Sequence, residues 1–199
     1  MKTTCSVLVI LVLFAALPSA AQVAFGLKAG LNLTTLNLKD PGSSYDSRAG
    51  YHAGIFLRGK FDKVGVQPEL LLFTQNGERR SSFITGTVQE HFTYLSIPLM
   101  FKFYPLGGLN IQVGPQFGFL LDGEREYDSG LGGSGSQDIT DYYKESDVSV
   151  SVGGGYDFDF GLSLDLRYNI GVKDINNAAD GDEARSRIFL LSLGWNFLQ

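Results

Sequence analysis

Two histidines are the side chains in this sequence best suited to acid–base chemistry. His52 and His91 each lie next to a long polar segment, at what we expect to be the rim of the fold. A catalytic histidine needs a nucleophile and an orienting acid within hydrogen-bond reach, and no spacing in the sequence establishes such a group. We therefore expect no catalytic residues and no enzyme. A histidine-dependent enzyme at the rim is the weaker alternative.

Two other segments imitate ligand-binding motifs. Residues 130–135 match G-x-G-x-x-G, but they lie in a polar segment without the preceding strand and following helix that phosphate binding requires. Residues 180–183 suggest a calcium loop. If Gly181 is taken as the loop glycine, Ala178 occupies the third ligand position and Arg187 the twelfth, so the match fails. We expect no cofactor and no metal site.

A third set of charged side chains alternates with apolar residues along several segments. Its members are Lys28, Arg58, Lys60, Glu69, Lys102, Asp165, Arg167 and Lys173. Six are basic and two are acidic, and Asp157 adds a third acid. If one face of a sheet encloses them, we expect a packed network of ion pairs and hydrogen bonds. Glu69 and Asp165 would then bridge the basic residues, and loss of either would leave buried positive charge uncompensated.

Strands are the elements that must position these charges, because apolar residues recur at every second position. Eight strands are predicted, at residues 23–36, 50–61, 64–76, 91–104, 108–122, 147–158, 161–174 and 186–198. Tight turns alternate with long polar segments at 37–49, 77–90, 123–146 and 175–185. This alternation puts all the long segments at one end. It predicts an all-β fold, an eight-stranded antiparallel up-and-down transmembrane β-barrel.

The apolar face of each predicted strand decides between a membrane barrel and a soluble one. In the segment 161–174, leucines and other apolar residues alternate with Ser163, Asp165, Arg167 and Asn169, which are too polar for a small soluble core. Apolar faces five or six residues long match the span of the hydrocarbon layer by a tilted strand of about ten residues. We therefore expect contact with outer-membrane lipid. A soluble periplasmic barrel with the apolar faces turned inward is the alternative.

Prolines and aromatic residues mark details of the predicted strands. Pro68, Pro98 and Pro115 cannot donate to a strand ladder, so each is expected to mark a bulge or a missing hydrogen bond. Aromatic residues near the expected membrane edges suit interfacial girdles. They are Phe25, Phe61, Phe103, Tyr104, Phe158, Phe160 and Phe197 at the turn end, with Tyr51 and Phe92 at the other end.

The N-terminus and the composition indicate an exported protein. Lys2, the apolar run 7–17 and the small residues before Gln22 predict a cleaved signal peptide at 1–21 and a barrel domain at 22–199. Cys5, the only cysteine, would leave with the signal. The net charge of −5 disfavours nucleic acid as a partner.

Five segments together resemble one known family, the PorT-like outer-membrane β-barrel proteins, which are small barrels of the OmpX/OmpA type. The segments are residues 26–32 (GLKAGLN), 50–54 (GYHAG), 67–71 (QPELL), 94–99 (YLSIPL) and 167–171 (RYNIG). The resemblance implies an eight-stranded barrel in the bacterial outer membrane and, for most of the family, no known activity. The chain departs from the usual aromatic terminus, since Leu198 and Gln199 follow Phe197.

These observations lead to one functional expectation and one alternative. An eight-stranded barrel has an interior that side chains fill, so we expect a plugged lumen and a monomer that acts through its long loops. The loops at 37–49, 77–90, 123–146 and 175–185 would engage an envelope component or a host surface component, in a structural or surface-interaction role. The alternative is a narrow channel for small solutes.

Overall fold

The computed structural model describes residues 22–36, 45–47, 49–80, 86–129, 133–138, 146–172 and 186–198. These residues form ten strands: β1 (Gln22–Leu36), β2 (Tyr45–Ser47), β3 (Ala49–Phe61), β4 (Val64–Arg80), β5 (Gly86–Leu106), β6 (Leu109–Ser129), β7 (Gly133–Asp138), β8 (Ser146–Asp157), β9 (Leu162–Gly171) and β10 (Ser186–Leu198). No helix long and apolar enough to cross a membrane occurs among them.

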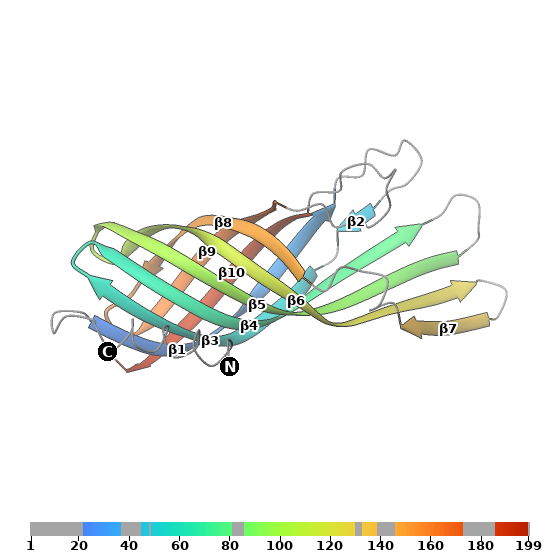
Figure 1. Cartoon of the computed structure of the whole chain (residues 1–199), viewed down its shortest axis with the longest axis horizontal. Helices are drawn as coiled ribbons and strands as arrows, with labels where there is room; N and C mark the ends of the chain where they lie inside the picture. The colour runs from blue at the N-terminus through green and yellow to red at the C-terminus, as the bar shows by residue number, and fades with distance from the viewer. Residues whose placement is uncertain are drawn as a thin grey trace, which may run out of the picture.

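Eight of these strands close into an antiparallel barrel, which confirms the predicted fold class (Figure 1). The order around the wall is β4-β3-β1-β10-β9-β8-β6-β5, with β5 returning to β4. Each strand therefore pairs with its sequence neighbour in the barrel, and β1 pairs with β10 to close the ring. The turns at 62–63, 107–108 and 158–161 lie at one end, called here the turn end, and the opposite end is the loop end.

The loop end departs from the predicted layout because three strands continue beyond their expected limits. β4 runs to Arg80 and β5 begins at Gly86, so most of the expected loop 77–90 is strand. β6 runs to Ser129 and pairs with β7 inside the expected loop 123–146. Outside a membrane both faces of a sheet meet water, so such strands carry no apolar alternation that would reveal them. The expected loop 175–185 lies outside the described residues.

The three prolines behave as expected for residues without an N–H group. Pairing between β3 and β4 is interrupted at Pro68, pairing between β4 and β5 at Pro98, and pairing between β5 and β6 at Pro115. The register is the same on either side of each gap, so the prolines remove ladder hydrogen bonds without adding a bulge. They fall on three consecutive strands of the same part of the wall.

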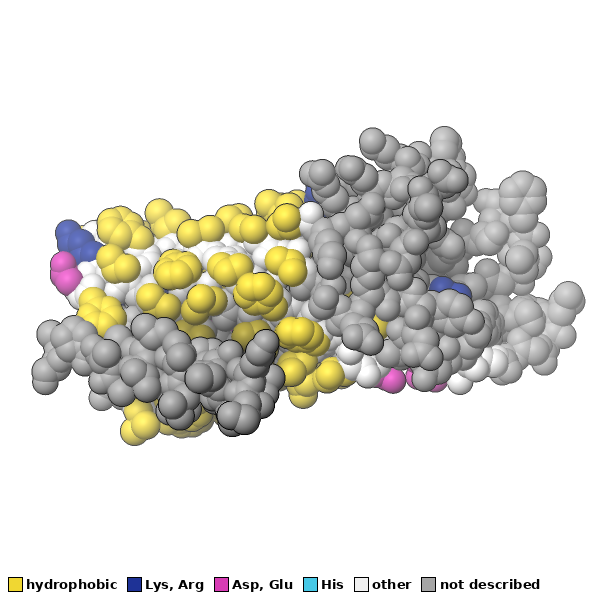
Figure 2. Space-filling view, in the orientation of Figure 1, with side chains coloured by type: hydrophobic (Ala, Val, Ile, Leu, Met, Phe, Trp, Pro, Cys, Tyr) yellow, Lys and Arg dark blue, Asp and Glu magenta, His cyan; other side chains and the backbone are white. Residues whose placement is uncertain are grey.

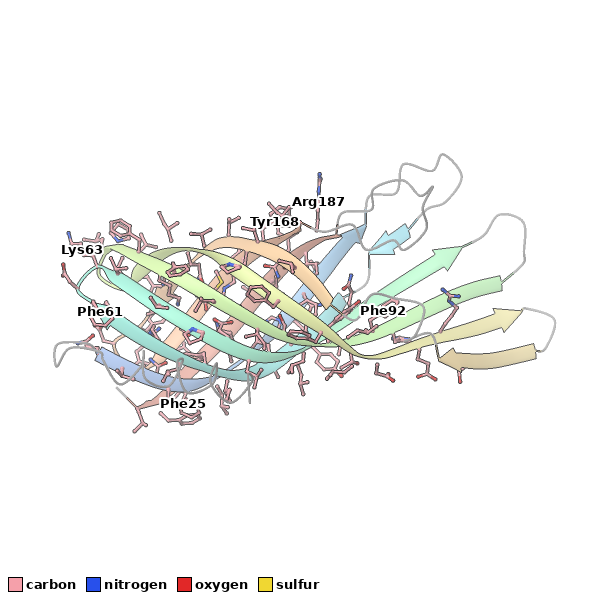
Figure 3. All side chains as sticks on the ribbon, viewed as in Figure 1. Phe25, Phe61, Lys63, Phe92, Tyr168 and Arg187 are labelled. Carbon is pink, nitrogen blue, oxygen red and sulfur yellow. The ribbon has the colours of Figure 1, made fainter. Side chains whose placement is uncertain are left out.

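The barrel wall is apolar outside and polar inside. Hydrophobic side chains cover the visible wall, and charged side chains appear at the turn end and again toward the loop end (Figure 2). Phe25 and Tyr168 point away from the wall (Figure 3), and Trp195 on β10 is 48% exposed. Lys28, Lys102 and the other interior polar side chains are buried. The sequence-based assignment of faces is therefore confirmed for the described strands.

Candidate functional site

Lys28 on β1 is the centre of the buried charge cluster. Its Nζ donates to Glu69 Oε1 and to Asp165 Oδ2, both at 2.7 Å. Gly26 and Gly30 flank it on the same face, and a Cβ at Gly26 would lie 2.6 Å from the ring of Phe56. The two glycines therefore leave the inner surface of β1 bare on both sides of Lys28. Phe56 occupies part of this space, with its ring centroid 5.6 Å from the ammonium.

Arg167 on β9 and Glu69 on β4 join strands that lie four places apart in the ring of eight. Arg167 Nη1 donates to Glu69 Oε2 at 2.8 Å and Nη2 to Oε1 at 2.6 Å, a bidentate pair. Gln112 on β6 holds the other edge of the guanidinium, because its Oε1 accepts from Arg167 Nε at 2.9 Å. The Nε2 of Gln112 then donates to Asp165 at 2.7 Å. Gln67 adds a bond to Glu69 at 2.6 Å.

Asp157, at the end of β8, joins the cluster to the turn end of the barrel. Its carboxylate accepts from the Tyr104 hydroxyl at 2.7 Å, lies 2.7 Å from Arg58 Nη1 and lies 3.4 Å from Lys102 Nζ. Lys102 also reaches Asp165 at 3.4 Å. The placement of Tyr104 in the interfacial girdle is wrong, because its ring is buried inside the barrel. The expectation failed because an amphipathic phenol suits a buried hydrogen bond as well as a membrane edge.

The eight expected network residues have three outcomes. Lys28, Arg58, Glu69, Lys102, Asp165 and Arg167 come together inside the barrel. Lys60 does not join their ion pairs, and its ammonium lies 4.3 Å from the centroid of the Tyr104 ring. Lys173 lies outside the described residues.

Sequence reasoning missed the neutral partners of the network. Gln67, Gln112 and Tyr104 connect the charged groups but carry no charge themselves. For two of them strand parity was a usable signal, because Gln67 faces the same way as Glu69 and Tyr104 the same way as Lys102, each two positions away. Gln112 has no charged residue two positions away, since Asn110 and Gly114 flank it on its face of the strand. Amides and phenols supply the extra hydrogen bonds that a buried ion cluster requires.

The buried cluster carries more positive than negative charge among the described residues. Four cations (Lys28, Arg58, Lys102 and Arg167) face three anions (Glu69, Asp157 and Asp165), an excess of one positive charge. Removing water from these charges is unfavourable, and multiple hydrogen bonds offset that cost. The cluster is therefore sensitive to loss of any one carboxylate.

The two histidines do not form a common site. The rim position expected for His52 is wrong: its ring is buried inside the barrel, stacked 6.1 Å from Phe73. Its Nε2 lies 2.8 Å from Ser192 Oγ, across the bare backbone of Gly30. The polar segment after β1 suggested a rim, whereas the strand parity of His52 sets its inward direction. His91 lies in the extended β5–β6 hairpin, where it is opposite Glu124.

Within the described residues no group of three His, Cys, Asp or Glu is arranged to hold a metal ion. Toward the loop end the interior becomes apolar, with Phe73, Ile188 and Leu190 packed beside Tyr94. A cavity of about 30 Å³ next to this layer has room for two or three waters.

A closed barrel with an apolar outer wall and a charged interior is the architecture of bacterial outer-membrane proteins. The outer membrane protein beta-barrel domain matches residues 17–177, which is most of the chain. The chain belongs to this family.

Several solved structures resemble the chain, each with a TM-score below 0.5. Neisserial surface protein A has a TM-score of 0.48 and 13% identity, covering 87% of this chain and 97% of that chain. Ail of Yersinia pestis, solved with the heparin analogue sucrose octasulfate, has a TM-score of 0.46 and 16% identity, covering 88% and 99%. OprG of Pseudomonas aeruginosa has a TM-score of 0.45 and 11% identity, covering 89% and 97%. No curated protein sequence matches the chain significantly.

Proposed function

We propose that this outer-membrane protein is a non-enzymatic surface-interaction protein whose lumen is plugged and whose loop end meets its partner. One observation carries the proposal. β4, β5 and β6 continue past the barrel into a sheet that β2 and β7 extend at its two sides (Figure 1). A hydrogen-bonded sheet outside the membrane presents a more defined surface than separate loops do.

The edges of this sheet suggest how a partner is bound. Among the described residues β2 pairs only with β4, and β7 pairs only with β6. Unpaired strand edges are templates for strand addition, in which main-chain hydrogen bonds supply affinity. The partner is an envelope component or a host surface component, reached through the segments 37–49, 77–90, 123–146 and 175–185.

The interior supports a plug rather than a pore. The Arg167–Glu69 pair spans the barrel, and Gln112 and Asp165 fill the space beside it. Eight strands enclose an interior only wide enough for side chains to fill. A cluster in which each carboxylate has several donors resists opening, because separating it exposes uncompensated charge.

We propose four further properties of the protein. The segment 1–21 lies outside the described residues, and we propose that it is a signal peptide cleaved before Gln22. We also propose membership of the PorT-like group within the broader family. The protein is proposed to be a monomer, with the loop end outside the cell.

Planar-bilayer conductance tests the plug. We expect the wild-type barrel to show no stepwise conductance, and Glu69→Ala combined with Arg167→Ala to show small steps because the cross-lumen pair is gone. The matched control is Ser163→Ala with Ser192→Ala, which shortens two interior side chains outside the ion pairs. Steps in the wild-type protein would overturn the plug and establish the narrow channel instead.

Truncation of the loop end tests the surface role. In the truncated variant, short turns replace residues 77–90 and 123–146. This change removes the extended sheet and keeps the predicted membrane strands. Bacteria displaying the wild-type or truncated chain are compared for adherence to epithelial cells and for cross-linking to envelope proteins. We expect truncation to abolish the interaction while the gel shift between unboiled and boiled samples persists. Equal behaviour of the two chains would place the function elsewhere.

A further inference from the structure

A polar pocket opens at the turn end of the barrel interior. Its volume is about 290 Å³. It is lined by the first three residues of β1, by Arg58 and Lys60 at the end of β3, and by residues 157–159. One water needs about 10–15 Å³ of such space, so the pocket has room for a small ion with part of its hydration shell.

Two basic and two acidic residues line the pocket, and one of the acidic residues, Asp157, is shared with groups outside the lining. Asp157 already accepts from Tyr104 and lies beside both Arg58 and Lys102. Asp159 is exposed in the turn, and neither it nor Lys60 forms an ion pair within the described part of the chain. The ammonium of Lys60 lies over the Tyr104 ring, which holds it at the pocket without supplying a carboxylate.

Arg58 is the second basic group of the pocket. Its side chain is 9% exposed, and its Nη1 lies 2.7 Å from Asp157 Oδ2. That contact is an ion pair whose alignment is not that of a hydrogen bond. An oxygen-rich anion in the pocket would give Nη1 an aligned acceptor in addition to this ion pair.

The excess positive charge of the barrel interior also favours an anion in the pocket. Four buried cations face three anions, and at the pocket Lys60 adds a positive charge and Asp159, exposed in the turn, a negative one, so an excess of one positive charge remains. Low-dielectric walls focus such a field toward the opening and raise the local concentration of counter-ions.

We propose that the turn-end pocket binds a small oxyanion of the phosphate class between the Arg58 guanidinium and the Lys60 ammonium. The anion is free phosphate or the phosphate of a phospholipid headgroup at the membrane surface. The site needs only the barrel, so it is independent of the proposed surface role.

Protection of lysines from acylation tests the site. The full barrel is folded in maltoside micelles, which contain no phosphate, and is treated with a water-soluble amine reagent at increasing inorganic phosphate. Acylation of Lys60 and Lys63 is followed by peptide mass spectrometry. Lys63 is the internal control, because it is exposed in the adjacent turn and does not line the pocket. We expect phosphate to slow acylation of Lys60 in a saturable way and to leave Lys63 unchanged.

A variant pair measures the contribution of Lys60. Radiolabelled phosphate is equilibrated with Lys60→Met, which keeps the length of the side chain, and with Lys63→Met as the control. Loss of one charge-assisted hydrogen bond weakens binding about tenfold, so we expect that loss for Lys60→Met alone. If Lys60→Met does not fold, as judged by the gel shift, the protection experiment on the unaltered chain decides.

Different outcomes separate the sources and can overturn the site. Protection by phosphatidylglycerol added to phosphate-free micelles assigns the anion to a lipid headgroup, and protection by inorganic phosphate alone assigns it to the free ion. Equal protection by sodium chloride at matched ionic strength would show screening only and would overturn the proposal. Absence of any protection of Lys60 relative to Lys63 would overturn it as well.

Discussion

Arg167 and Glu69 join opposite walls of the barrel. Their strands, β9 and β4, lie four places apart in the ring of eight, and two hydrogen bonds of 2.8 and 2.6 Å connect them. Sheet hydrogen bonds connect each strand only to its neighbours. This pair instead links the two halves of the wall directly, so it is expected to couple their stabilities.

Glu69→Gln is therefore expected to destabilise the barrel strongly. The substitution leaves Arg167 with only the longer 3.6 Å contact to Asp165 and Lys28 with Asp165 alone, and breaking a buried pair in this way costs about 3–5 kcal/mol. Unfolding by urea in micelles, followed through the fluorescence of the only tryptophan, Trp195, measures the loss. The control is Asp159→Asn, an exposed carboxyl in a turn, which should change the unfolding free energy little.

A double substitution checks that uncompensated charge is the cause. Adding Arg167→Met to Glu69→Gln removes the unpaired cation, so much of the lost stability should return. If the double variant is as unstable as the sum of the two single variants, the pair acts through packing and the electrostatic explanation is wrong.

Gly30→Ala tests whether the inner face of β1 requires a residue without a side chain at this position. A Cβ at this position would clash first with the backbone carbonyl oxygen of Leu191, and it would lie 2.7 Å from His52 Cε1, whose ring reaches across Gly30 toward Ser192. Crowding of this kind costs about 1–3 kcal/mol, and the fraction that shifts on an unboiled gel should fall. Gly135→Ala is the control, since a Cβ there meets nothing within 4 Å. Equal gel shifts for both variants would contradict the close fit around Gly30.

The signal peptide gives a prediction that needs only thiol chemistry. Cys5 is the only cysteine of the chain, and cleavage before Gln22 removes it. The membrane-embedded protein, unfolded in denaturant, should therefore fail to react with a maleimide, and its N-terminal peptide should begin at Gln22. The control is Ser6→Ala, which leaves Cys5 in place, and this variant should react with the maleimide to the same extent as the wild-type protein. A labelled protein of full length would mean that residues 1–21 are retained.

Much of this fold can be predicted from the sequence because side chains alternate between the two faces of each strand. In a barrel wall between lipid and a polar interior, each residue meets one of two opposite environments, so alternation reveals both the strand and its faces. Leu164 and Asp165 illustrate this contrast: the first is 41% exposed on the outer wall and the second is fully buried. Six of the eight expected charged residues meet inside the barrel for the same reason.

The parts that the sequence did not reveal lack this contrast. β4 beyond the barrel and β7 have no apolar face, so their strands have no period to detect. Gln112 and Tyr104 were missed because hydrogen bonds between distant strands depend on register around the ring, which a single strand does not encode. The position of His52 in the alternation along its strand predicts a side chain that faces inward. The adjacent polar segment had instead suggested that His52 lies at the rim of the barrel.

The register of the extended sheet can be tested by disulfide formation, because the mature chain is expected to contain no other cysteine. Gln89 on β5 is directly opposite Glu126 on β6. Cysteines at these two positions should cross-link on mild oxidation, since directly opposed residues have Cβ atoms about 4.5–5.5 Å apart. The pair Gln89→Cys with Asp128→Cys is displaced by two residues and should cross-link far less. Equal cross-linking of both pairs would show that this segment is a loop.

Charge placed on the outer wall tests the membrane contact, and its depth dependence makes the test specific. Leu191 lies in the middle of β10 and Leu198 at its turn end, and both side chains face outward. Arginine at the hydrocarbon midplane costs about 2–4 kcal/mol and near the interface about 0–1 kcal/mol. Leu191→Arg should therefore lower the stability of the barrel in vesicles far more than Leu198→Arg, as measured by urea unfolding. In a soluble barrel both positions meet water, so a similar small effect of the two substitutions would contradict the lipid-facing wall.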